Sequence, residues 1–378
     1  MNLLLVNYEY PPVGGGAANA TQFLGRALLE LGHSVDVLTS GLSGSDGTSV
    51  EDGMRIHRLP IGRRHLDRAS QWEMLTFLRQ SVAAVSRLQQ VQRWEAAIAF
   101  FTIPSGPAAL RLHRLGGAPY VVSLRGGDVP GHVPGLGFKH LLTRPLRRSV
   151  LRHASAIIAN SEGLATTSRM ADPFPVAIVP NGVDCAVFHP ADRRPEPAGA
   201  RRLRLLFVGR LHPEKNLGVV LSQFAALPAS IRDRIELHVA GDGSQRAELK
   251  LLAEKLGLAA QIQWLGWQAK PGLPTLYRGA DALVNPSQYE GMSNVVLEAM
   301  ASGLPVFASD VPGNRAVVLP GRTGILFPLQ KPAQLGSALA GLVTDPAWGR
   351  ALGEAGRERA LADFSWKRAA ESYLELLR

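Results

Sequence analysis

The chain has 378 residues, with 41 lysines and arginines against 31 aspartates and glutamates, a formal net charge of +10, and 46% hydrophobic residues. This length suits two or three domains, and the apolar content excludes a disordered or fibrous protein. The single cysteine, Cys185, excludes an internal disulfide and a cysteine-based zinc site, which favours a reducing compartment, the cytoplasm.

The chain begins with a short apolar run at residues 2–7, which predicts a buried strand and lacks the basic stretch of a signal peptide. Three glycines, Gly14 to Gly16, precede a segment with apolar residues at helical spacing. This order places the backbone N–H groups of Gly15 and Gly16 at a helix N-terminus, where an anion or a sugar hydroxyl can bind. The spacing departs from the dinucleotide-binding G-x-G-x-x-G pattern, and a tight turn of small residues remains the alternative.

Short apolar runs that predict strands alternate with helical patterns through both halves of the chain, which favours parallel sheets of βαβ units. In the first half they are 34–38, 96–100, 120–124, 156–159 and 177–179, and in the second half 203–208, 235–240, 262–265, 282–284 and 305–308. The proline-rich and charged stretch 191–202 predicts a linker between domains of residues 1–190 and 203–363. A final helical stretch, 364–378, is expected to pack back on the first domain. The architecture predicted is α/β, with two Rossmann-like doubly wound domains facing a central cleft.

Two basic residues follow the strand that opens the second domain. Gly209 and Arg210 come directly after this strand, and Lys215 lies five residues beyond Arg210. Across a tight turn the two cations can converge on one diphosphate, the arginine by bidentate contact and the lysine as a point charge. Solvated surface charges are the alternative interpretation, which the position at a strand's carboxyl end disfavours.

Glu290 and Glu298 form the sharpest motif of the chain, because the first follows a strand and turn while the second lies on a predicted helix. Their separation is too large for the carboxyl pair of a glycosidase, which argues against a simple hydrolase. It favours two acceptors for two different sugar rings, with backbone N–H groups between them available to phosphate oxygens. These N–H groups belong to Gly291, Met292, Ser293, Asn294 and Val295.

The segment 138–153 carries Lys139, Arg144, Arg147, Arg148 and Arg152 and no acidic residue. Such a basic amphipathic segment could lie on an anionic membrane surface or face an anionic acceptor, and a solvated arginine-rich helix face is the alternative. No stretch of about 18 apolar residues predicts a transmembrane helix, so membrane contact is expected to be peripheral. Two tryptophans, Trp264 and Trp267, are expected to pack in the core.

Taken as a set, in order and along essentially the whole chain, these motifs resemble the retaining GT-B glycosyltransferases of family 4. The motifs are Pro11-Pro12 with the glycine triplet, Asn181-Gly182-Val183-Asp184, Gly209-Arg210-Leu211 with Lys215-Asn216, Gly241-Asp242-Gly243, and the Glu290/Glu298 pair.

The resemblance implies a division of labour among these residues. Glu298 would bind the ribose hydroxyls of a nucleotide, and Glu290 the hydroxyls of the donor sugar. Arg210 and Lys215 would neutralise the diphosphate, so that no cofactor and no metal is expected, and no D-x-D pair occurs in the chain. Gly266 and Trp267 would border the base. Gly15 and Gly16 would let the first domain approach the phosphates and the acceptor.

One motif departs from the family pattern. Many relatives carry His-Gly-x-Asp after a strand of the first domain, and here Arg125 stands where the histidine is expected, while Gly126 and Asp128 match. Asp128 is therefore expected in the site, with Arg125 and Asn181 as weaker candidates. An arginine at this position could pair with phosphate or with Asp128.

The function implied is retaining transfer of a sugar from a nucleotide diphosphate sugar to a saccharide or lipid-linked acceptor, in cell-surface polysaccharide or glycolipid synthesis at the inner face of the membrane. A nucleotide-sugar epimerase of the same fold is an alternative. It would differ from a transferase in releasing free nucleotide without needing an acceptor. The positive charge also permits a nucleic-acid-binding protein, although the chain lacks a recognition motif and that function leaves the Glu290/Glu298 pair without a task. No nucleic-acid partner is therefore expected.

Overall fold

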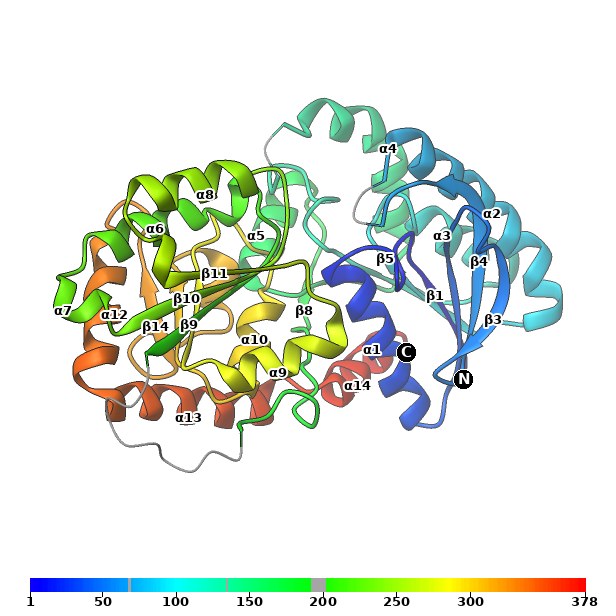
Figure 1. Ribbon diagram of the computed structural model, residues 1–378. Coiled ribbons are helices and arrows are strands. Elements are labelled where there is room, and N and C mark those ends of the chain that lie inside the picture. The colour runs from blue at the N-terminus through cyan, green and yellow to red at the C-terminus, as the bar shows by residue number, and fades with distance from the viewer. Residues whose placement is uncertain (67–68, 134, 192–201) are drawn as a thin grey trace. The chain divides into compact units, whose positions relative to one another are not determined.

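The computed structural model describes residues 1–66, 69–133, 135–191 and 202–378. They form two compact units, unit 1 of Met1–Gly182 with Trp366–Arg378 and unit 2 of Val183–Ser365 (Figure 1). The change between the units lies ahead of the boundary expected after residue 190. Residues beyond Gly182 associate with unit 2 because the Val183 N–H donates to the Phe364 carbonyl at 2.8 Å and Phe188 packs in that unit's core. Apart from its two end positions, the expected linker 191–202 lies outside the described residues.

Unit 1 is built on an eight-stranded sheet with the order β3-β4-β2-β1-β5-β6-β7-β8. All neighbouring strands run parallel except β3, which is antiparallel to β4. The pair β3 and β4 was not predicted from the sequence, and β2 extends further than expected. The strands are β1 (Asn2–Val6), β2 (Ser34–Leu42), β3 (Gly47–Glu51), β4 (Met54–Arg63), β5 (Ala96–Phe100), β6 (Tyr120–Ser123), β7 (Ala156–Ala159) and β8 (Ala177–Ile178).

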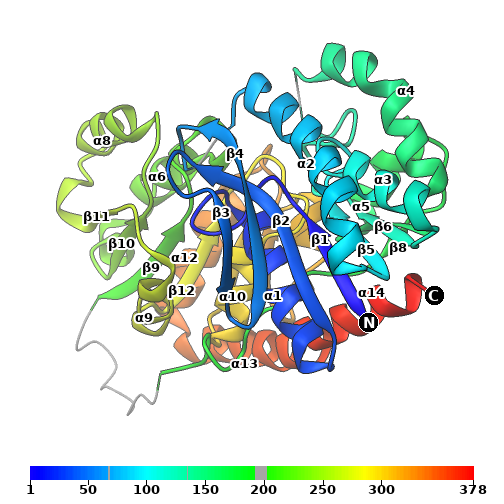
Figure 2. The same ribbon diagram turned by 90° about the vertical axis from the view of Figure 1, so that its right-hand side faces the viewer.

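The helices of unit 1 cover both faces of this sheet. Helices α2, α3 and α4 follow one another side by side, and α14 lies alongside α1 in both views of the molecule (Figures 1 and 2). The stacked rings of Phe23 and Trp366, with centroids 5.8 Å apart, join α1 to α14. The helices are α1 (Gly16–Glu30), α2 (Gln71–Gln92), α3 (Gly106–Gly116), α4 (Gly137–His153), α5 (Glu162–Ala171) and α14 (Trp366–Leu376).

Unit 2 has a six-stranded sheet in which all neighbours run parallel, with the order β11-β10-β9-β12-β13-β14. Its strands are β9 (Leu203–Val208), β10 (Ile235–Ala240), β11 (Ile262–Gly266), β12 (Ala282–Asn285), β13 (Val306–Ser309) and β14 (Gly324–Phe327). Its longer helices are α6 (Leu217–Ala225), α8 (Arg246–Lys255), α9 (Leu273–Gly279), α10 (Asn294–Ala301), α12 (Ala333–Thr344) and α13 (Pro346–Asp363). The short ones are η1 (Pro213–Lys215), α7 (Ala229–Arg232), η2 (Ala259–Gln261), η3 (Lys270–Gly272) and α11 (Pro312–Arg315).

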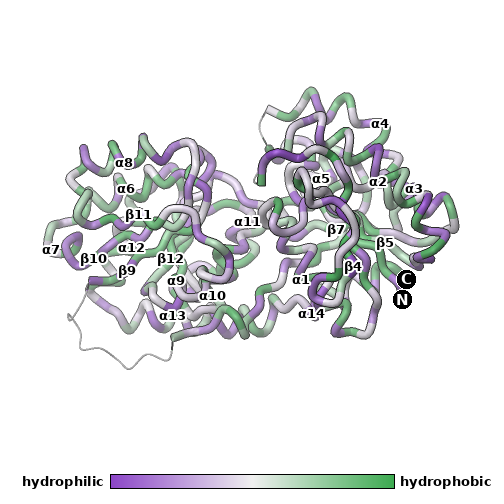
Figure 3. Tube along the Cα trace, turned by 45° about the vertical axis from the view of Figure 1, so that its right-hand side comes forward, coloured by the Kyte–Doolittle hydropathy of each residue, from purple (hydrophilic) through white to green (hydrophobic). Residues whose placement is uncertain are grey.

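Apolar strands form the centre of each unit, and the loops that leave them are more polar (Figure 3). Burial on both faces explains why the strands read as continuous apolar runs rather than as alternating patterns. The two Rossmann-like doubly wound domains predicted from the sequence are therefore confirmed. In such sheets the carboxyl ends of all the parallel strands lie along the same side, which is called the carboxyl edge below. These folds bind ligands there.

Candidate functional site

The turn after β9 holds the two predicted cations of unit 2. The Gly209 N–H donates to the Ala240 carbonyl at 3.0 Å, and η1 then carries the chain to α6. The Lys215 ammonium lies 2.6 Å from the Glu290 carboxylate, and the Arg210 guanidinium lies 3.6 Å from the Glu214 carboxylate. Both cations thus lie at the carboxyl edge of the sheet.

Glu290 and Glu298 flank the beginning of α10, the first in a loop and the second on the helix, as the sequence predicted. Ser293 is the N-cap, and its hydroxyl accepts the Val296 N–H at 3.4 Å and a hydrogen bond from the Asn285 amide at 2.7 Å. The Met292 side chain is buried in the core of unit 2. The main-chain N–H groups near the helix start suit the phosphate contact expected there.

Glu298 faces Tyr277 of α9, a residue that the sequence analysis missed. The Tyr277 hydroxyl donates to the Glu298 carboxylate at 2.8 Å. Burial raises the pKa of the Glu298 carboxyl to about 7, although this hydrogen bond acts in the opposite direction by favouring the ionised form. A carboxyl with a pKa near neutrality can accept two hydroxyl hydrogen bonds once it is ionised. Nothing in the chain order signals this contact, because α9 and α10 are separated by β12.

Gly313 lies close against the backbone of Glu290, and the sequence analysis did not predict this contact either. A Cβ atom at this position would lie 2.3 Å from the Glu290 carbonyl oxygen and 2.6 Å from the Glu290 Cβ. Only glycine allows the start of α11 to approach the loop so closely. The Pro312-Gly313 pair after β13 is the signal that could have indicated a special backbone position.

Gly266 is the last residue of β11, and Trp267 follows it. Gly266 has a φ of +69°, in the left-handed region that favours glycine, and its carbonyl accepts the Gly241 N–H at 2.7 Å. Trp264 packs against the core of unit 2, but Trp267 is 73% exposed. The expectation that Trp267 packs in the core is wrong, since the turn at Gly266 directs the chain away from the sheet.

The glycine turn of unit 1 lies between β1 and α1. Gly15 and Gly16 are exposed at the start of this helix, and a Cβ atom at Gly15 would meet nothing within 4 Å. Gly14 has a φ of +95°, and a Cβ atom there would lie 2.7 Å from that of Glu9. The main-chain N–H groups at this helix start are therefore open to a ligand.

Asp128 is buried, and its carboxylate is held by the loop after β5. One oxygen accepts the Thr102 N–H at 2.7 Å and the Thr102 hydroxyl at 3.0 Å, and the other accepts the Arg125 N–H at 2.9 Å. This arrangement fixes the loop that carries Arg125.

The guanidinium of Arg125 points toward the C-terminal helix. It donates to the Asn181 amide oxygen at 2.8 Å and to the Tyr373 hydroxyl at 3.4 Å, and it lies over the Phe100 ring. Burial lowers the pKa of this guanidinium. Arg125 therefore joins the end of β6 to Asn181 and to α14.

The basic segment of α4 is less uniformly exposed than the sequence suggested. Arg147 and Arg148 lie 2.6 Å and 2.7 Å from the buried Asp172 carboxylate of unit 1. These two arginines hold α4 in place and do not line an exposed basic stripe. Lys139, Arg144 and Arg152 remain exposed.

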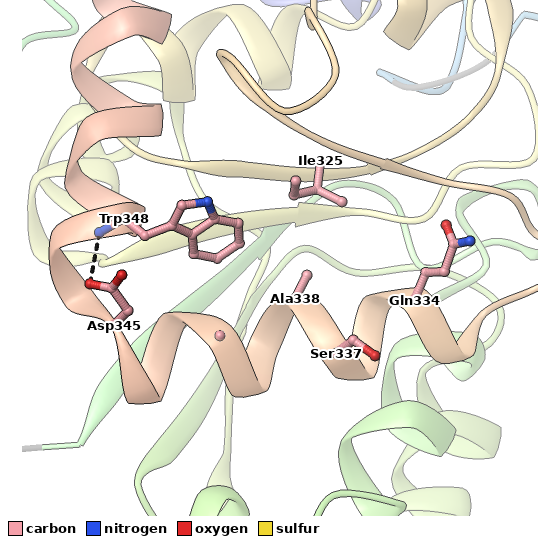
Figure 4. Close-up of a pocket in the computed structure, with 7 residues that line it drawn as sticks. Ile325, Gln334, Ser337, Ala338, Asp345 and Trp348 are labelled. Atoms are coloured by element: carbon pink, nitrogen blue, oxygen red, sulfur yellow. Dashed lines mark hydrogen bonds between the residues drawn. The ribbon is translucent and has the colours of Figure 1, made fainter.

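Outside these positions, a cavity of about 390 Å³ lies beside α12 (Figure 4). Trp348 projects into it from α13 toward Ile325, and Asp345 caps that helix by accepting the Trp348 N–H at 3.1 Å. Its lining contains none of the predicted site residues. Within the described ranges, no three His, Cys, Asp or Glu side chains gather as a metal site, and no helix has the length and apolar character to span a membrane.

Comparison with known proteins identifies both units. Residues 189–359 match the family model for glycosyl transferases group 1, and residues 15–182 match that for a glycosyl transferase 4-like domain. Over 401 aligned residues the chain is 30% identical to a glycogen synthase of Mycobacterium tuberculosis, covering 98% of this chain and 92% of the relative. It is 32% identical over 395 residues to a D-inositol 3-phosphate glycosyltransferase of Arthrobacter sp., covering 97% and 91%.

A solved structure of sucrose-phosphate synthase from Thermosynechococcus elongatus matches with a TM-score of 0.84 at 25% identity, covering 99% of this chain and 98% of that one. The fold is that of the GT-B glycosyltransferases. The chain belongs to glycosyltransferase family 4. It is an enzyme that transfers a sugar from a nucleotide sugar, and the relatives favour this activity over an epimerase or a nucleic-acid-binding protein.

Proposed function

We propose that the enzyme transfers a glycosyl group, with retention of anomeric configuration and without a metal ion, to a saccharide or lipid-linked acceptor in cell-surface polysaccharide or glycolipid synthesis. The observation that carries this proposal is the pairing of Lys215 with Glu290 at 2.6 Å, beside the helix that holds Glu298. A cation for phosphate and two carboxylates for hydroxyl groups are thereby grouped at one edge of the unit 2 sheet.

Each part of the nucleotide sugar has a binding residue in this arrangement. Glu298 accepts the ribose hydroxyls, and Glu290 accepts hydroxyls of the donor sugar. Arg210 and Lys215 contact the diphosphate, together with the main-chain N–H groups at the start of α10. The exposed Trp267 and the turn at Gly266 border the base.

As the bond from the anomeric carbon to the diphosphate breaks, negative charge develops on the leaving oxygen, and the two cations stabilise it. The acceptor hydroxyl forms the new bond on the same face of the sugar and gives its proton to the leaving phosphate. The products are the glycosylated acceptor and a nucleoside diphosphate. In unit 1, Gly15, Gly16 and the loop fixed by Asp128 are proposed to contact the phosphates and the acceptor.

The donor is tested by thermal shift with UDP, GDP, ADP and their common sugar conjugates, with and without EDTA. A nucleotide at about 100 times its Kd should add about 2.7 kcal/mol of stability. Glu298→Ala should abolish turnover while the fold is kept, and Arg210→Ala should slow transfer by about a hundredfold. The matched control is Glu254→Ala, an exposed carboxylate on α8. Unchanged nucleotide affinity in Glu298→Ala contradicts the assignment, and the anomeric signal of the product in NMR decides retention.

We further propose that α4 contacts an anionic membrane surface at the inner face of the membrane. The helix exposes Phe138, Leu141 and Leu142 next to Lys139 and Arg144. Apolar side chains beside cations suit the boundary between acyl chains and anionic headgroups. The full chain should sediment with phosphatidylglycerol vesicles and not with phosphatidylcholine vesicles. Equal sedimentation with both contradicts the proposal.

A further inference from the structure

The beginning of α2 presents large apolar side chains to solvent. Trp72 is 77% exposed, and Leu75, one turn further on, is also exposed. On the opposite face of the same helix, Phe77, Ser81 and Val85 are buried against unit 1. Because residues three apart share one helix face, Trp72 and Leu75 form a surface that packing within unit 1 does not need.

This helix start is well defined. The Ser70 hydroxyl accepts the Glu73 N–H at 3.2 Å, and the Glu73 carboxylate accepts the N–H groups of Ser70 at 2.5 Å and of Arg64 at 3.1 Å. This capping box fixes the first turn and uses the one acidic side chain of residues 71–80 internally. The exposed face carries Arg79 two turns after Trp72 and no negative charge.

The beginning of α4 has the same character. Phe138 is 73% exposed, and it shares a helix face with Leu141 and Leu142, which are also exposed. Successive residues on a helix turn by about 100°, so this face points away from Arg147 and Leu151, which are buried. By the same geometry Lys139 and Arg144 flank the apolar face on its two sides.

Both helix starts lie at one edge of unit 1. Helix α2 follows β4 and α4 follows β6, and these strands belong to the same sheet and run in the same direction. The two helices therefore begin at the carboxyl edge, and both views place these starts at the same end of unit 1 (Figures 1 and 2). Trp72, Leu75, Phe138, Leu141 and Leu142 are called the apolar end patch below.

We infer that the apolar end patch is a two-helix docking face for a lipid bilayer with anionic headgroups, and that Trp72 is its anchor on α2. The inference rests on the proposed membrane contact of α4 and extends it to a second helix. An indole ring combines a large apolar surface with one N–H donor, which suits the level of the headgroups. Cations beside both apolar surfaces complement anionic lipid, whereas an apolar protein partner would not require them.

The apolar end patch lies at the same edge of the unit 1 sheet as the glycine turn. Helix α1, with Gly15 and Gly16 at its start, follows β1 and also begins at the carboxyl edge of this sheet. A bilayer held at this edge would present a lipid-linked acceptor to the glycine turn and to the loop of Asp128. The acceptor class that fits the docking face is therefore a glycolipid or lipid-linked saccharide rather than a free sugar.

The test uses the full chain and vesicles of phosphatidylglycerol and phosphatidylcholine. Tryptophan fluorescence of the parent should shift to the blue on addition of anionic vesicles, and Trp72→Phe should lose most of this shift. Trp72→Ser should weaken vesicle binding about tenfold or more, the scale of one large apolar side chain. The matched control is Val91→Ser, since Val91 is 76% exposed near the other end of α2, about 28 Å away along the helix.

The outcomes separate this inference from the proposals on which it rests. Loss of vesicle binding in Phe138→Ser with none in Trp72→Ser would overturn the role of α2 and leave the α4 proposal standing. Conversion of a dimer to a monomer by Trp72→Ser, seen by light scattering without any change in vesicle binding, would assign the patch to self-association and overturn the inference. Trp72→Ser should release nucleoside diphosphate in solution at the same rate as the parent enzyme. If the parent enzyme itself releases none, the proposed reaction is contradicted and the membrane inference is not.

Discussion

The ammonium group of Lys215 and the carboxylate of Glu290 lie 2.6 Å apart, although 75 residues separate them in the chain. If Lys215 contacts the diphosphate and Glu290 contacts the donor sugar, a bound donor must exchange this ion pair for contacts of its own. The phosphate and sugar contacts are then coupled, because a nucleotide without sugar takes the lysine and leaves the carboxylate without a partner.

This coupling predicts opposite effects of Glu290→Gln on two ligands. Removing the competing charge should make the nucleoside diphosphate alone bind several-fold more tightly, the scale of one partly exposed ion pair. Turnover of the nucleotide sugar should fall by about tenfold or more, since the sugar loses a charged acceptor. Calorimetry of nucleotide binding and initial rates check the two effects. A parallel loss of both would show that Glu290 serves only to hold the loop.

The raised pKa of Glu298 makes nucleotide binding depend on pH. With the pKa near 7, the carboxyl of the free enzyme is largely protonated at lower pH, and only the ionised form accepts both ribose hydroxyls. Affinity should fall by up to about tenfold for each pH unit below 7 and level off above it. Calorimetry from about pH 5.5 to about pH 8.5 checks this. Tyr277→Phe removes a hydrogen bond that favours the ionised form, so it should move the midpoint to higher pH.

The Glu298 carboxyl should affect the free energy of unfolding in the opposite direction, because its contribution to stability falls as the pH rises. Its pKa in the folded chain lies above the ordinary value of 4.5, so protonation favours the folded state. This stabilising contribution is present below the ordinary pKa and is lost as the pH rises through about 7. In Glu298→Gln, the free energy of unfolding should therefore depend less on pH between these values. An unchanged pH profile in that variant would place the titration elsewhere.

Gly313→Ala should weaken donor binding although it replaces no donor-binding side chain. The new methyl group would meet the Glu290 carbonyl oxygen at 2.3 Å, a backbone atom, so the loop that carries Glu290 must shift. We expect a loss of donor affinity of about tenfold and a destabilisation of about 1–3 kcal/mol, typical of overpacking. Gly279→Ala is the control, because a Cβ atom there would meet nothing within 4 Å. Equal affinity in the two variants would contradict the supporting role of Gly313.

Tyr373→Phe should destabilise unit 1. The Tyr373 hydroxyl lies 2.5 Å from the Ser123 hydroxyl and accepts from Arg125 at 3.4 Å, so its removal leaves buried polar groups with fewer partners. The cost should be about 1–3 kcal/mol in urea unfolding. Adding Ser123→Ala should recover part of it, since both partners of one hydrogen bond are then absent. A double variant that loses the sum of both single effects would contradict this account.

Alternation of apolar runs with helical patterns predicted most strands of both sheets, because strands buried on two faces need continuous apolar sequence. The strands that were missed are the edge strands β3 and β14 and the strand β4, which lies between β3 and β2. Both β3 and β4 contain polar and charged residues, so their sequences show less of the apolar signal.

The local structure of the candidate site was predictable where it depends on a short motif, as for the placement of Glu290 in a loop and Glu298 on a helix. The contacts of Tyr277 and Gly313 are tertiary, and no spacing in the sequence reveals them. The same reason explains the misjudged arginines of α4, since the partner of Arg147 and Arg148 is Asp172, beyond the next strand. Trp267 was misplaced because a backbone turn at Gly266, rather than hydrophobicity, sets its exposure.

Helix α14 belongs to unit 1 but follows all of unit 2 in the chain. During synthesis, the sheet face that carries α1 therefore lacks this helix until every residue of unit 2 has left the ribosome. Until then Phe23 and Ser123 lack their partners Trp366 and Tyr373. The first unit to be made is thus the last to be completed, and the nascent chain has an exposed surface on which a chaperone could act.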